Sequence, residues 1–260
     1  MALITFMSDF GDCDHYVAAV KAKIYSINPD ARMLDISHGI ARFNIAHGSF
    51  VLKSVFKSFP EGTVHLVAVN SNYDIQPRFV GLEVEKHYFV GPDNGLLSLI
   101  SDQEAGAVVL LPRPATNGIS YFPERDILAQ AAAKLAVGKS LDEIGEPYGQ
   151  MKRMINKQAR ATKQKISGSV IHVDHYGNLI TNIQYKDFEI LSKDKKYKIN
   201  YGRTFADQIH PSIASVVQGE SFHIFNSLGL LEIGINMGNG SELLGLGYDS
   251  PVHIIFEDQH

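Results

Sequence analysis

In residues 1–150, short apolar runs alternate with segments of helical periodicity. LITFM (3–7), RMLDIS (32–37) and VHLVAV (64–69) have the length and composition of buried strands. Between them, HYVAAVKAKIYSI (15–27) and NIAHGSFVLKSVFKSF (44–59) place apolar residues at helical spacing. Strands joined by crossover helices pair in parallel. The alternation therefore predicts an α/β domain with a largely parallel sheet.

The same domain continues beyond its third predicted strand. FVGLEVEKHYFVG (79–91) predicts a strand or hairpin, and PDNG (92–95) has the residue types of a tight bend. GLLSLI (95–100) predicts a short helix, and RDILAQAAAKLAVG (125–138) predicts an alanine-rich helix that ends at its glycine. We place this α/β domain in residues 1–150.

The pattern changes after residue 150. Residues 151–165 are basic and lack strong periodicity, so we predict a linker there. The rest of the chain consists of short β-like runs separated by glycine turns, such as KYKINYG (196–202) and PVHIIFED (251–258). This pattern predicts a small all-β, barrel-like domain over residues 166–260.

Composition limits the possible functions. The chain carries 24 Lys and Arg against 28 Asp and Glu, so it lacks the basic footprint of a nucleic-acid-binding protein. Its apolar runs are shorter than the ~20 residues that a membrane-spanning helix needs. The single cysteine, Cys13, excludes an internal disulfide framework and suits a reducing compartment. The N-terminus has no basic region, so we expect no signal peptide and a cytoplasmic protein.

Three acidic residues follow the first predicted strand: Asp9, Asp12 and Asp14. Asp12 precedes a predicted helix, where a carboxylate accepts backbone N–H bonds, so we expect it to cap that helix. Asp9 comes directly after the strand, at the edge where α/β sheets bind ligands, and its carboxylate can accept both hydrogen bonds of a ribose diol. The alternative is that these three acids and His15 together bind a metal cation. The spacings of calcium loops and zinc sites are absent, so we expect no metal.

Two polar loops extend this candidate site. NSNYDIQPR (70–78) follows the third predicted strand, and VDHYGNLITNI (173–183) predicts a hairpin with Tyr176, Gly177 and Asn178 at its turn. Taken singly, each loop is also explained as an ordinary surface turn. The residues alone therefore predict a ligand-binding protein with a polar site at a strand edge.

Seven motifs together resemble one protein family. They follow the family's order along nearly the whole chain: FMSDFGDCD (6–14), NPDARMLDISHGI (28–40), FPEGTVHLVAV (59–69), FVGPDNGLLS (89–98), ERDILAQAAAKLAVG (124–138), VDHYGNLITNI (173–183) and NSLGLLEIGINMGN (226–239). The chain resembles the S-adenosyl-L-methionine (SAM) hydroxide adenosyltransferases, also called SAM hydrolases. Their relatives are the SAM-dependent fluorinases and chlorinases.

The resemblance implies an N-terminal α/β domain, a C-terminal β-barrel-like domain and a homotrimer. It implies SAM as the substrate, with no cofactor. SAM would bind between the N-terminal domain of one subunit and the C-terminal domain of its neighbour. The expected partners are therefore a small nucleoside substrate and other copies of the chain, and ligand binding should be linked to assembly.

The resemblance also assigns ligand contacts. Asp9 would hold the ribose hydroxyls, Asp14 would face the methionine part, and Phe43 would stack near the ribose. In the second domain, the remaining contacts divide between the amino-acid end of SAM and the adenine. Asp174 and Ser227 would hold the amino-acid end, Asn178 would read the adenine edge, Tyr176 and Phe205 would sandwich the ring, and the backbone near Met237 would complete the adenine contacts.

The catalytic positions match less closely. Asn70 stands where hydrolases of the family have an aspartate, Arg78 matches their arginine, and Pro123 replaces their histidine. Glu124 occupies the position of a small hydroxyl residue in halogenases, and its charge would repel a halide, so we expect no halogenation. Asn70 can orient a water but cannot accept its proton. Glu124 or Asp74 is therefore the predicted base, and Arg78 would stabilise developing hydroxide charge.

Three functions follow from these matches and substitutions. The leading prediction is a SAM hydrolase, in which water attacks C5′ of SAM to give adenosine and L-methionine. The second is a catalytically silent homotrimer that binds SAM or adenosine, favoured by Asn70 and Pro123. The third is adenosyl transfer to another nucleophile.

Overall fold

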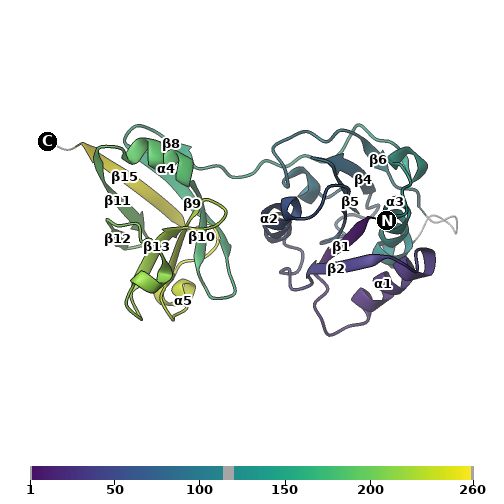
Figure 1. Cartoon of the computed structure of the whole chain (residues 1–260), viewed down its shortest axis with the longest axis horizontal. Coiled ribbons are helices and arrows are strands. Elements are labelled where there is room, and N and C mark those ends of the chain that lie inside the picture. Colours follow the sequence, from purple (N-terminus) through teal and green to yellow (C-terminus); the bar gives the residue numbers. More distant parts are fainter. Residues whose placement is uncertain (1, 114–119, 259–260) are drawn as a thin grey trace. The chain divides into compact units, whose positions relative to one another are not determined.

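The computed structural model describes residues 2–113 and 120–258. The chain divides into two compact units, Met1–Ile155 and Asn156–His260 (Figure 1). The first unit is mixed α/β, and the second consists mainly of antiparallel strands. Among the described residues, no helix has both the length and the apolar composition that crossing a membrane would require.

The first unit is built on a seven-stranded sheet in the order β2-β1-β3-β5-β4-β6-β7. Its strands are β1 (Leu3–Ser8), β2 (Arg32–Ser37), β3 (Val64–Ala68), β4 (Phe79–Val84), β5 (His87–Pro92), β6 (Val108–Leu110) and β7 (Glu146–Pro147). β1 pairs in parallel with β2 and β3, and β3 pairs in parallel with β5. The other three pairs are antiparallel.

The predicted parallel pairing thus covers four strands, and the sheet as a whole is mixed. The change of direction occurs at the hairpin between β4 and β5. Its two-residue turn is Glu85 and Lys86, with φ of 49° and 65°. A turn with two left-handed residues joins adjacent antiparallel strands, so this segment cannot form a parallel crossover.

Helices cover both faces of this sheet. They are α1 (Tyr16–Ile27), α2 (Ile45–Val55), η1 (Phe56–Ser58), η2 (Leu96–Ser98), the π-helix η3 (Glu124–Leu128), α3 (Ala129–Ala136) and η4 (Leu141–Glu143). Figure 1 shows α1 and α3 on one side of the sheet and α2 on the other. Alternating residues of β1 face the two cores: Phe6 packs in the core with α1 and α3, and Met7 packs in the core with α2.

Residues 148–155 follow β7 and are bound to the first unit. Asp93 accepts hydrogen bonds from the Tyr148 hydroxyl at 3.1 Å and from the Lys152 backbone N–H at 2.7 Å. The Met154 backbone N–H donates to the Ser98 hydroxyl at 2.9 Å. The first part of the segment that we predicted as a linker therefore has fixed contacts with the α/β unit.

The second unit contains an eight-stranded sheet, in which β12-β11-β15-β9-β10-β14-β13 form the path and β8 pairs with β9. Its strands are β8 (Arg160–Ala161), β9 (Lys165–Val173), β10 (Leu179–Gln184), β11 (Lys195–Tyr201), β12 (Thr204–Ala206), β13 (Ser221–Phe225), β14 (Leu230–Ile235) and β15 (Pro251–Asp258). Its helices are α4 (Tyr185–Ser192), η5 (Ile213–Ser215) and α5 (Gly240–Leu244).

Side chains join the two ends of this sheet. The Tyr201 hydroxyl on β11 lies 2.7 Å from His223 Nε2 on β13. The segment after β12 completes the closure, because the His210 backbone N–H donates to the His223 carbonyl at 2.7 Å. Burial, with a smaller contribution from His210, lowers the pKa of His223 to about 4, so the imidazole at this closure is neutral at pH 7. The unit is therefore nearly barrel-shaped.

Candidate functional site

The polar residues of the first unit gather where β1 and β3 end. β1 lies between β2 and β3 in the sheet, so the chain leaves β1 toward one edge and leaves β3 toward the other. Ligands of open α/β sheets bind at the carboxyl ends of strands at such a switch point. Asp9 directly follows β1, and its backbone N–H donates to the carbonyl of Ala68, the last residue of β3, at 3.2 Å. The fold thus places Asp9 at the switch point.

The Asp9 carboxylate joins three loops. Its Oδ2 accepts hydrogen bonds from the backbone N–H of Phe43 at 2.9 Å and from that of Asn70 at 3.1 Å. Both donors have left-handed backbone, with φ of 62° at Phe43 and 49° at Asn70. A bulky residue such as Phe43 adopts this conformation at a cost of about 1–3 kcal/mol, which the surrounding structure must offset. The structure therefore brings together three residues that the sequence predicted for the site.

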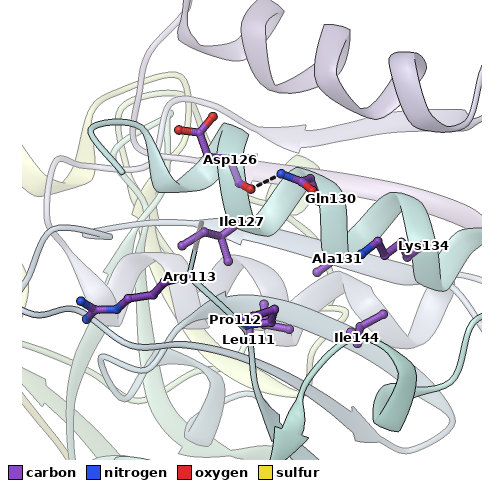
Figure 2. A pocket seen from close by; sticks show the side chains of 9 residues that line it. All are labelled: Leu111, Pro112, Arg113, Asp126, Ile127, Gln130, Ala131, Lys134 and Ile144. Carbon is purple, nitrogen blue, oxygen red and sulfur yellow. Dashed lines mark hydrogen bonds between the residues drawn. The ribbon is translucent and has the colours of Figure 1, made fainter. Parts of the chain in front are cut away.

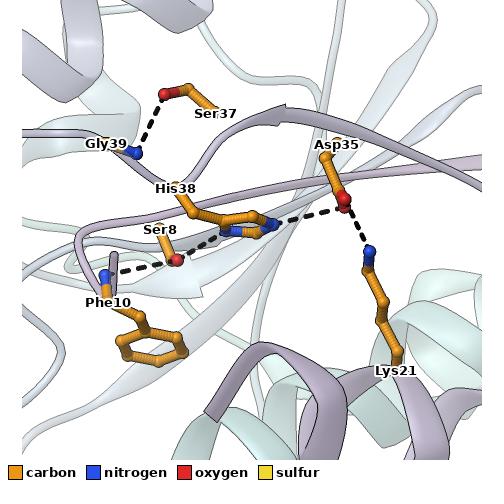
Figure 3. A network of polar contacts seen from close by, with 7 residues as sticks. All are labelled: Ser8, Phe10, Lys21, Asp35, Ser37, His38 and Gly39. Atoms are coloured by element: carbon orange, nitrogen blue, oxygen red, sulfur yellow. Dashed lines mark hydrogen bonds and ion pairs between the residues drawn. The ribbon is translucent and has the colours of Figure 1, made fainter. Parts of the chain in front are cut away.

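A chain of polar contacts fixes the end of β1 (Figure 3). The Ser8 hydroxyl lies 2.7 Å from His38 Nδ1, and His38 Nε2 lies 3.3 Å from Asp35 Oδ1. Lys21 binds the other carboxylate oxygen of Asp35. The residue types are those of a nucleophilic triad, but Ser8 has no exposed surface and cannot reach a substrate. We interpret these contacts as support for the adjacent Asp9.

Glu124 is a buried carboxylic acid that lies close enough to Asp9 for the charge of Asp9 to affect its pKa. It is 4% exposed and opens η3. Burial raises its pKa, and the charge of Asp9 raises it further, while its own backbone N–H and the nearby Ser71 hydroxyl act in the opposite direction. The Ser71 hydroxyl is itself buried and makes no hydrogen bond of regular geometry with the described residues. The predicted base Glu124 is therefore desolvated and within electrostatic range of Asp9, and its catalytic role stays a prediction. Ser71 was not predicted for the site.

Asn94 is a second residue that the sequence did not assign. It is 1% exposed, and its Nδ2 donates to the carbonyls of Val69 at 2.8 Å and Asn70 at 3.1 Å. Its Oδ1 accepts the backbone N–H of Leu96 at 3.1 Å. Asn94 thus holds the start of the loop after β3. The PDNG sequence predicts only a tight bend and carries no signal for this role.

The Arg78 guanidinium is bound to Tyr148 and not to Asp9. It donates to the Tyr148 hydroxyl at 2.9 Å, and that hydroxyl in turn donates to Asp93. The Tyr148 hydrogen bond raises the pKa of Arg78, which stays cationic. No contact of the described residues joins the Arg78 side chain to Asp9 or Glu124.

The acids after Asp9 are exposed. Asp14 makes no hydrogen bond or ion pair with the described residues, and its contact with the methionine part of SAM stays a prediction. The prediction that Asp12 caps the first helix is wrong. α1 begins at Tyr16, its N-cap is His15, and no side chain caps it. The helix starts too far along the chain for Asp12 to reach its first N–H groups.

Two hollows in the first unit lie away from Asp9. Figure 2 shows the smaller one, a cavity of about 120 Å³ between β6 and the η3–α3 helix. A neighbouring groove of about 500 Å³ includes Arg78, Arg113 and Glu146. The first is smaller than the ~300 Å³ of an ordinary small-molecule pocket, and neither is lined by Asp9, Asn70 or Glu124.

The predicted hairpin of the second unit is confirmed, since β9 ends at Val173 and β10 begins at Leu179. Asp174 organises its turn. One carboxylate oxygen accepts the backbone N–H groups of Tyr176 at 2.9 Å and Asn178 at 2.8 Å, and the other accepts Asn178 Nδ2 at 3.1 Å. The turn therefore holds Asn178 in place and leaves Tyr176 76% exposed.

The same turn packs against the segment that follows β14. The Gly177 carbonyl accepts the Ser241 backbone N–H at 2.8 Å, and a Cβ on Gly177 would lie 1.9 Å from Asn239 Oδ1. Met237, in this segment, is 82% exposed and has a left-handed φ of 59°. The structure thus places Tyr176 and Met237, two more predicted ligand contacts, on adjoining loops. Phe205 is also exposed, on β12, but no described contact joins its side chain to this turn.

Glu232 links Asn178 to a further turn. Its Oε1 accepts Asn178 Nδ2 at 3.1 Å, and its Oε2 accepts Asn226 Nδ2 at 3.0 Å. Burial raises the pKa of Glu232, and the two amide donors oppose this shift. Ser227, predicted to hold the amino-acid end of SAM, directly follows Asn226 and is exposed. Glu232 was not predicted for the site, although a carboxylate inside the apolar run LLEIGI was the available signal.

Where the structure describes the chain, no group of three or more His, Cys, Asp or Glu side chains is arranged so that it could hold a metal ion.

Protein-family models match both units. The model of the SAM hydroxide adenosyltransferase N-terminal domain matches residues 4–145, and the model of the C-terminal domain matches residues 168–253. The chain belongs to the SAM hydroxide adenosyltransferase family. The family predicted from the seven motifs is therefore confirmed.

Individual relatives agree with this assignment over nearly their full length. The chain is 30% identical to an (R)-S-adenosyl-L-methionine hydrolase of Thermus thermophilus, covering 98% of this chain and 100% of the relative. It is 29% identical to a hydrolase of the same name from Methanocaldococcus jannaschii, covering 98% and 96%. The crystal structure of a conserved protein from Thermotoga maritima matches with a TM-score of 0.87 and 30% identity, covering 97% of this chain and all of that one.

Proposed function

We propose that this protein is a SAM hydrolase, which converts SAM and water into adenosine and L-methionine. The observation that carries this proposal is the buried Glu124 carboxyl group beside Asp9, at the switch point of a sheet in this family. A raised pKa makes the Glu124 carboxylate a stronger base, which suits the removal of a proton from water.

The proposed step is a single displacement. The water oxygen forms a bond to C5′ while the C5′–S bond breaks, and the electron pair of that bond remains on sulfur as the neutral thioether of methionine. The proton of the water passes to Glu124. The sulfonium is a good leaving group, so no general acid is required. The protein must instead supply an in-line, partly desolvated water at near-attack distance.

The remaining residues have proposed roles around this step. Asp9 would hold the ribose hydroxyls, with its other acceptor capacity used by Phe43 and Asn70. The Asn70 side chain would orient the water. Arg78 would stabilise the developing hydroxide, which requires its guanidinium to leave Tyr148.

We further propose that the second unit supplies the adenine and amino-acid contacts, and that it does so from a neighbouring subunit of a homotrimer. The exposure of the predicted aromatic contacts supports this arrangement, since Phe43 is 72% and Phe205 is 67% exposed in the single chain. Large apolar side chains exposed to this extent are suited to being covered by a ligand or another subunit.

Incubation with SAM tests the proposal directly. The purified protein should release adenosine and L-methionine, detected by chromatography, and the rate should fall as the pH is lowered through the raised pKa of Glu124. Glu124→Gln should lower kcat by about 10²–10⁴-fold, because it removes the base. It should leave the Kd for SAM, measured by calorimetry, nearly unchanged.

Asp126→Asn is the matched control. Asp126 lies on the same helical turn, and its hydrogen bond with Arg125 lowers its pKa, so it is a poor base. This variant should keep kcat within a few-fold of the wild-type value. Equal losses in both variants would contradict a specific role for Glu124.

A second function, binding without catalysis, is favoured by Asn70 and Pro123 at two positions where the family's hydrolases carry catalytic residues. Calorimetric SAM binding with no adenosine formed over a day would establish it in place of hydrolysis. Mass spectrometry of the ligand that co-purifies with the protein would reveal adenosyl transfer to a different nucleophile. Halide is a poor candidate for that nucleophile, because the Glu124 charge repels it.

A further inference from the structure

Glu232 is a buried acid that the proposed hydrolysis does not use. It is 8% exposed, on β14 between two apolar neighbours, and each of its oxygens accepts a hydrogen bond from a side-chain amide. Placing a carboxylate in such a position costs free energy unless it is hydrogen-bonded. Its partners, Asn178 and Asn226, lie on two different turns, so Glu232 joins the turn of Asn178 to the turn of Ser227.

These contacts determine how the Asn178 amide is oriented. Its Nδ2 donates to Asp174 Oδ2 at 3.1 Å and to Glu232 Oε1 at 3.1 Å, so both amide hydrogens are used by carboxylates. The reverse orientation would place the amide oxygen against two acceptors, which repels. Asn178 Oδ1 accepts no hydrogen bond from the described residues and is not fully enclosed. Asn178 therefore presents an acceptor and no free donor.

Gly234 leaves the space that this orientation needs. A Cβ on Gly234 would lie 2.3 Å from Asn178 Oδ1, so any larger residue there would displace the oxygen. An acceptor held in this way can bind the exocyclic amine of a 6-aminopurine. It would face the carbonyl oxygen of a 6-oxopurine, where two acceptors meet without a proton between them.

We infer that Glu232 is a positioning residue that makes the site select 6-aminopurine over 6-oxopurine nucleosides by fixing the Asn178 amide. This inference rests on the proposed function, in which Asn178 reads the adenine edge. Glu232 itself touches no ligand. It acts through Asn178, and through Asn226 it ties the same network to the turn that would hold the amino-acid end.

Glu232→Gln is the sharpest substitution, because it preserves shape and removes one acceptor. A glutamine can accept from only one of the two amides and must direct its own NH₂ at the other. Asn226 is held independently, since its Oδ1 accepts the backbone N–H groups of Leu228 at 3.0 Å and Leu230 at 3.2 Å. On Asn178, one amide hydrogen keeps Asp174 Oδ2 as its acceptor and the other loses Glu232, so the amide is held on one side only and can rotate to offer a donor.

The test measures Kd by calorimetry, and KM where turnover occurs, for SAM and for S-inosyl-L-methionine, its 6-oxo counterpart. The wild type should prefer SAM by on the order of tenfold to a hundredfold, the effect of one unpaired buried polar group. Glu232→Gln should reduce this preference at least fivefold, through weaker binding of SAM and stronger binding of the inosyl compound. A purely structural role would weaken both ligands alike.

Thr181→Val is the matched control. Thr181 is also buried on the neighbouring strand. Its hydroxyl donates to the Leu231 carbonyl at 3.0 Å and makes no hydrogen bond with Asn178 or Glu232. It should lose stability and keep the wild-type preference. A folded Glu232→Gln protein with the wild-type preference overturns the inference.

Three further outcomes are informative. If Glu232→Gln does not fold, Glu232→Asp gives the same comparison, because its shorter side chain cannot reach both amides; an unchanged preference there also overturns the inference. If the wild type binds neither compound, the proposed function fails as well. Binding of SAM with no discrimination against the inosyl compound refutes only the role of Glu232.

Discussion

Asp9 shows how one side chain can serve both fold and function. Its Oδ2 is occupied by the N–H groups of Phe43 and Asn70, each of which has a left-handed backbone. The carboxylate therefore stabilises two strained loops at the place where we propose that it holds ribose. A buried or half-buried carboxylate with such partners contributes more to stability than an exposed acid of the same charge.

Asp9→Ala should remove both functions. We expect the free energy of unfolding to fall by about 1–3 kcal/mol, because two backbone donors lose a charged acceptor. SAM binding should fall below detection by calorimetry. Asp12→Ala is the control, since Asp12 lies in the same loop, is exposed and makes no capping bond. Unchanged SAM affinity in Asp9→Ala would remove the ribose assignment.

At the scale of elements, the site depends on turns whose shape is fixed from outside the turn. The β9–β10 hairpin carries Tyr176 and Asn178, and Gly177 between them has a φ of 82°. Its carbonyl is bound by α5, and Asn239 fills the space beside it. Gly177 is therefore required both for its backbone conformation and for this close approach.

Gly177→Ala and Gly219→Ala separate these two requirements. Both glycines have positive φ, 82° and 87°, but no atom lies within 4 Å of a Cβ built on Gly219. Gly219→Ala should therefore lose only the conformational term, about 1 kcal/mol. Gly177→Ala should lose about 1–3 kcal/mol more, because Asn239 must move. Chemical denaturation measures both losses, and equal values would show that the contact with Asn239 is easily relieved.

At the scale of the whole molecule, the predicted contacts are distributed over two units. Asp9, Asn70 and Glu124 lie in the first, and Asp174 and Asn178 lie in the second. Each unit has its own hydrophobic core, so each can hold its part of the site rigidly. Our proposal that the two parts meet across subunits of a trimer makes activity a property of the assembly.

Complementation tests this proposal. Asp9→Ala and Asn178→Ala should each be inactive alone. When the two variants are co-expressed in equal amounts, about one site in three of each mixed trimer would combine intact halves from two subunits. Random assembly makes about three quarters of the trimers mixed, so about one quarter of the wild-type activity should return. If both halves come from one chain, every site carries a defect. The absence of any recovery in trimers shown to be mixed would contradict a shared site.

The sequence predicted those parts of the site that local patterns determine. Asp9 was placed at a strand end because an apolar run stops directly before it, and the hairpin around Gly177 followed from its turn residues. Asn94, Ser71 and Glu232 were missed. Each of these three residues acts through a partner more than 20 residues away in the chain, or through its burial. A local sequence pattern shows neither the distant partner nor the burial.

For this protein, the sequence by itself determined the family, through its ordered motifs, and most of the order of strands and helices, through periodicity and turn chemistry. The ligand contacts that the resemblance implies stay predictions. Only the tertiary structure decided that Asp12 does not cap a helix, that Arg78 is bound to Tyr148, and that Glu124 is desolvated beside Asp9. Those properties depend on which distant groups the folded chain brings within a few ångströms, and on how much water it excludes from them.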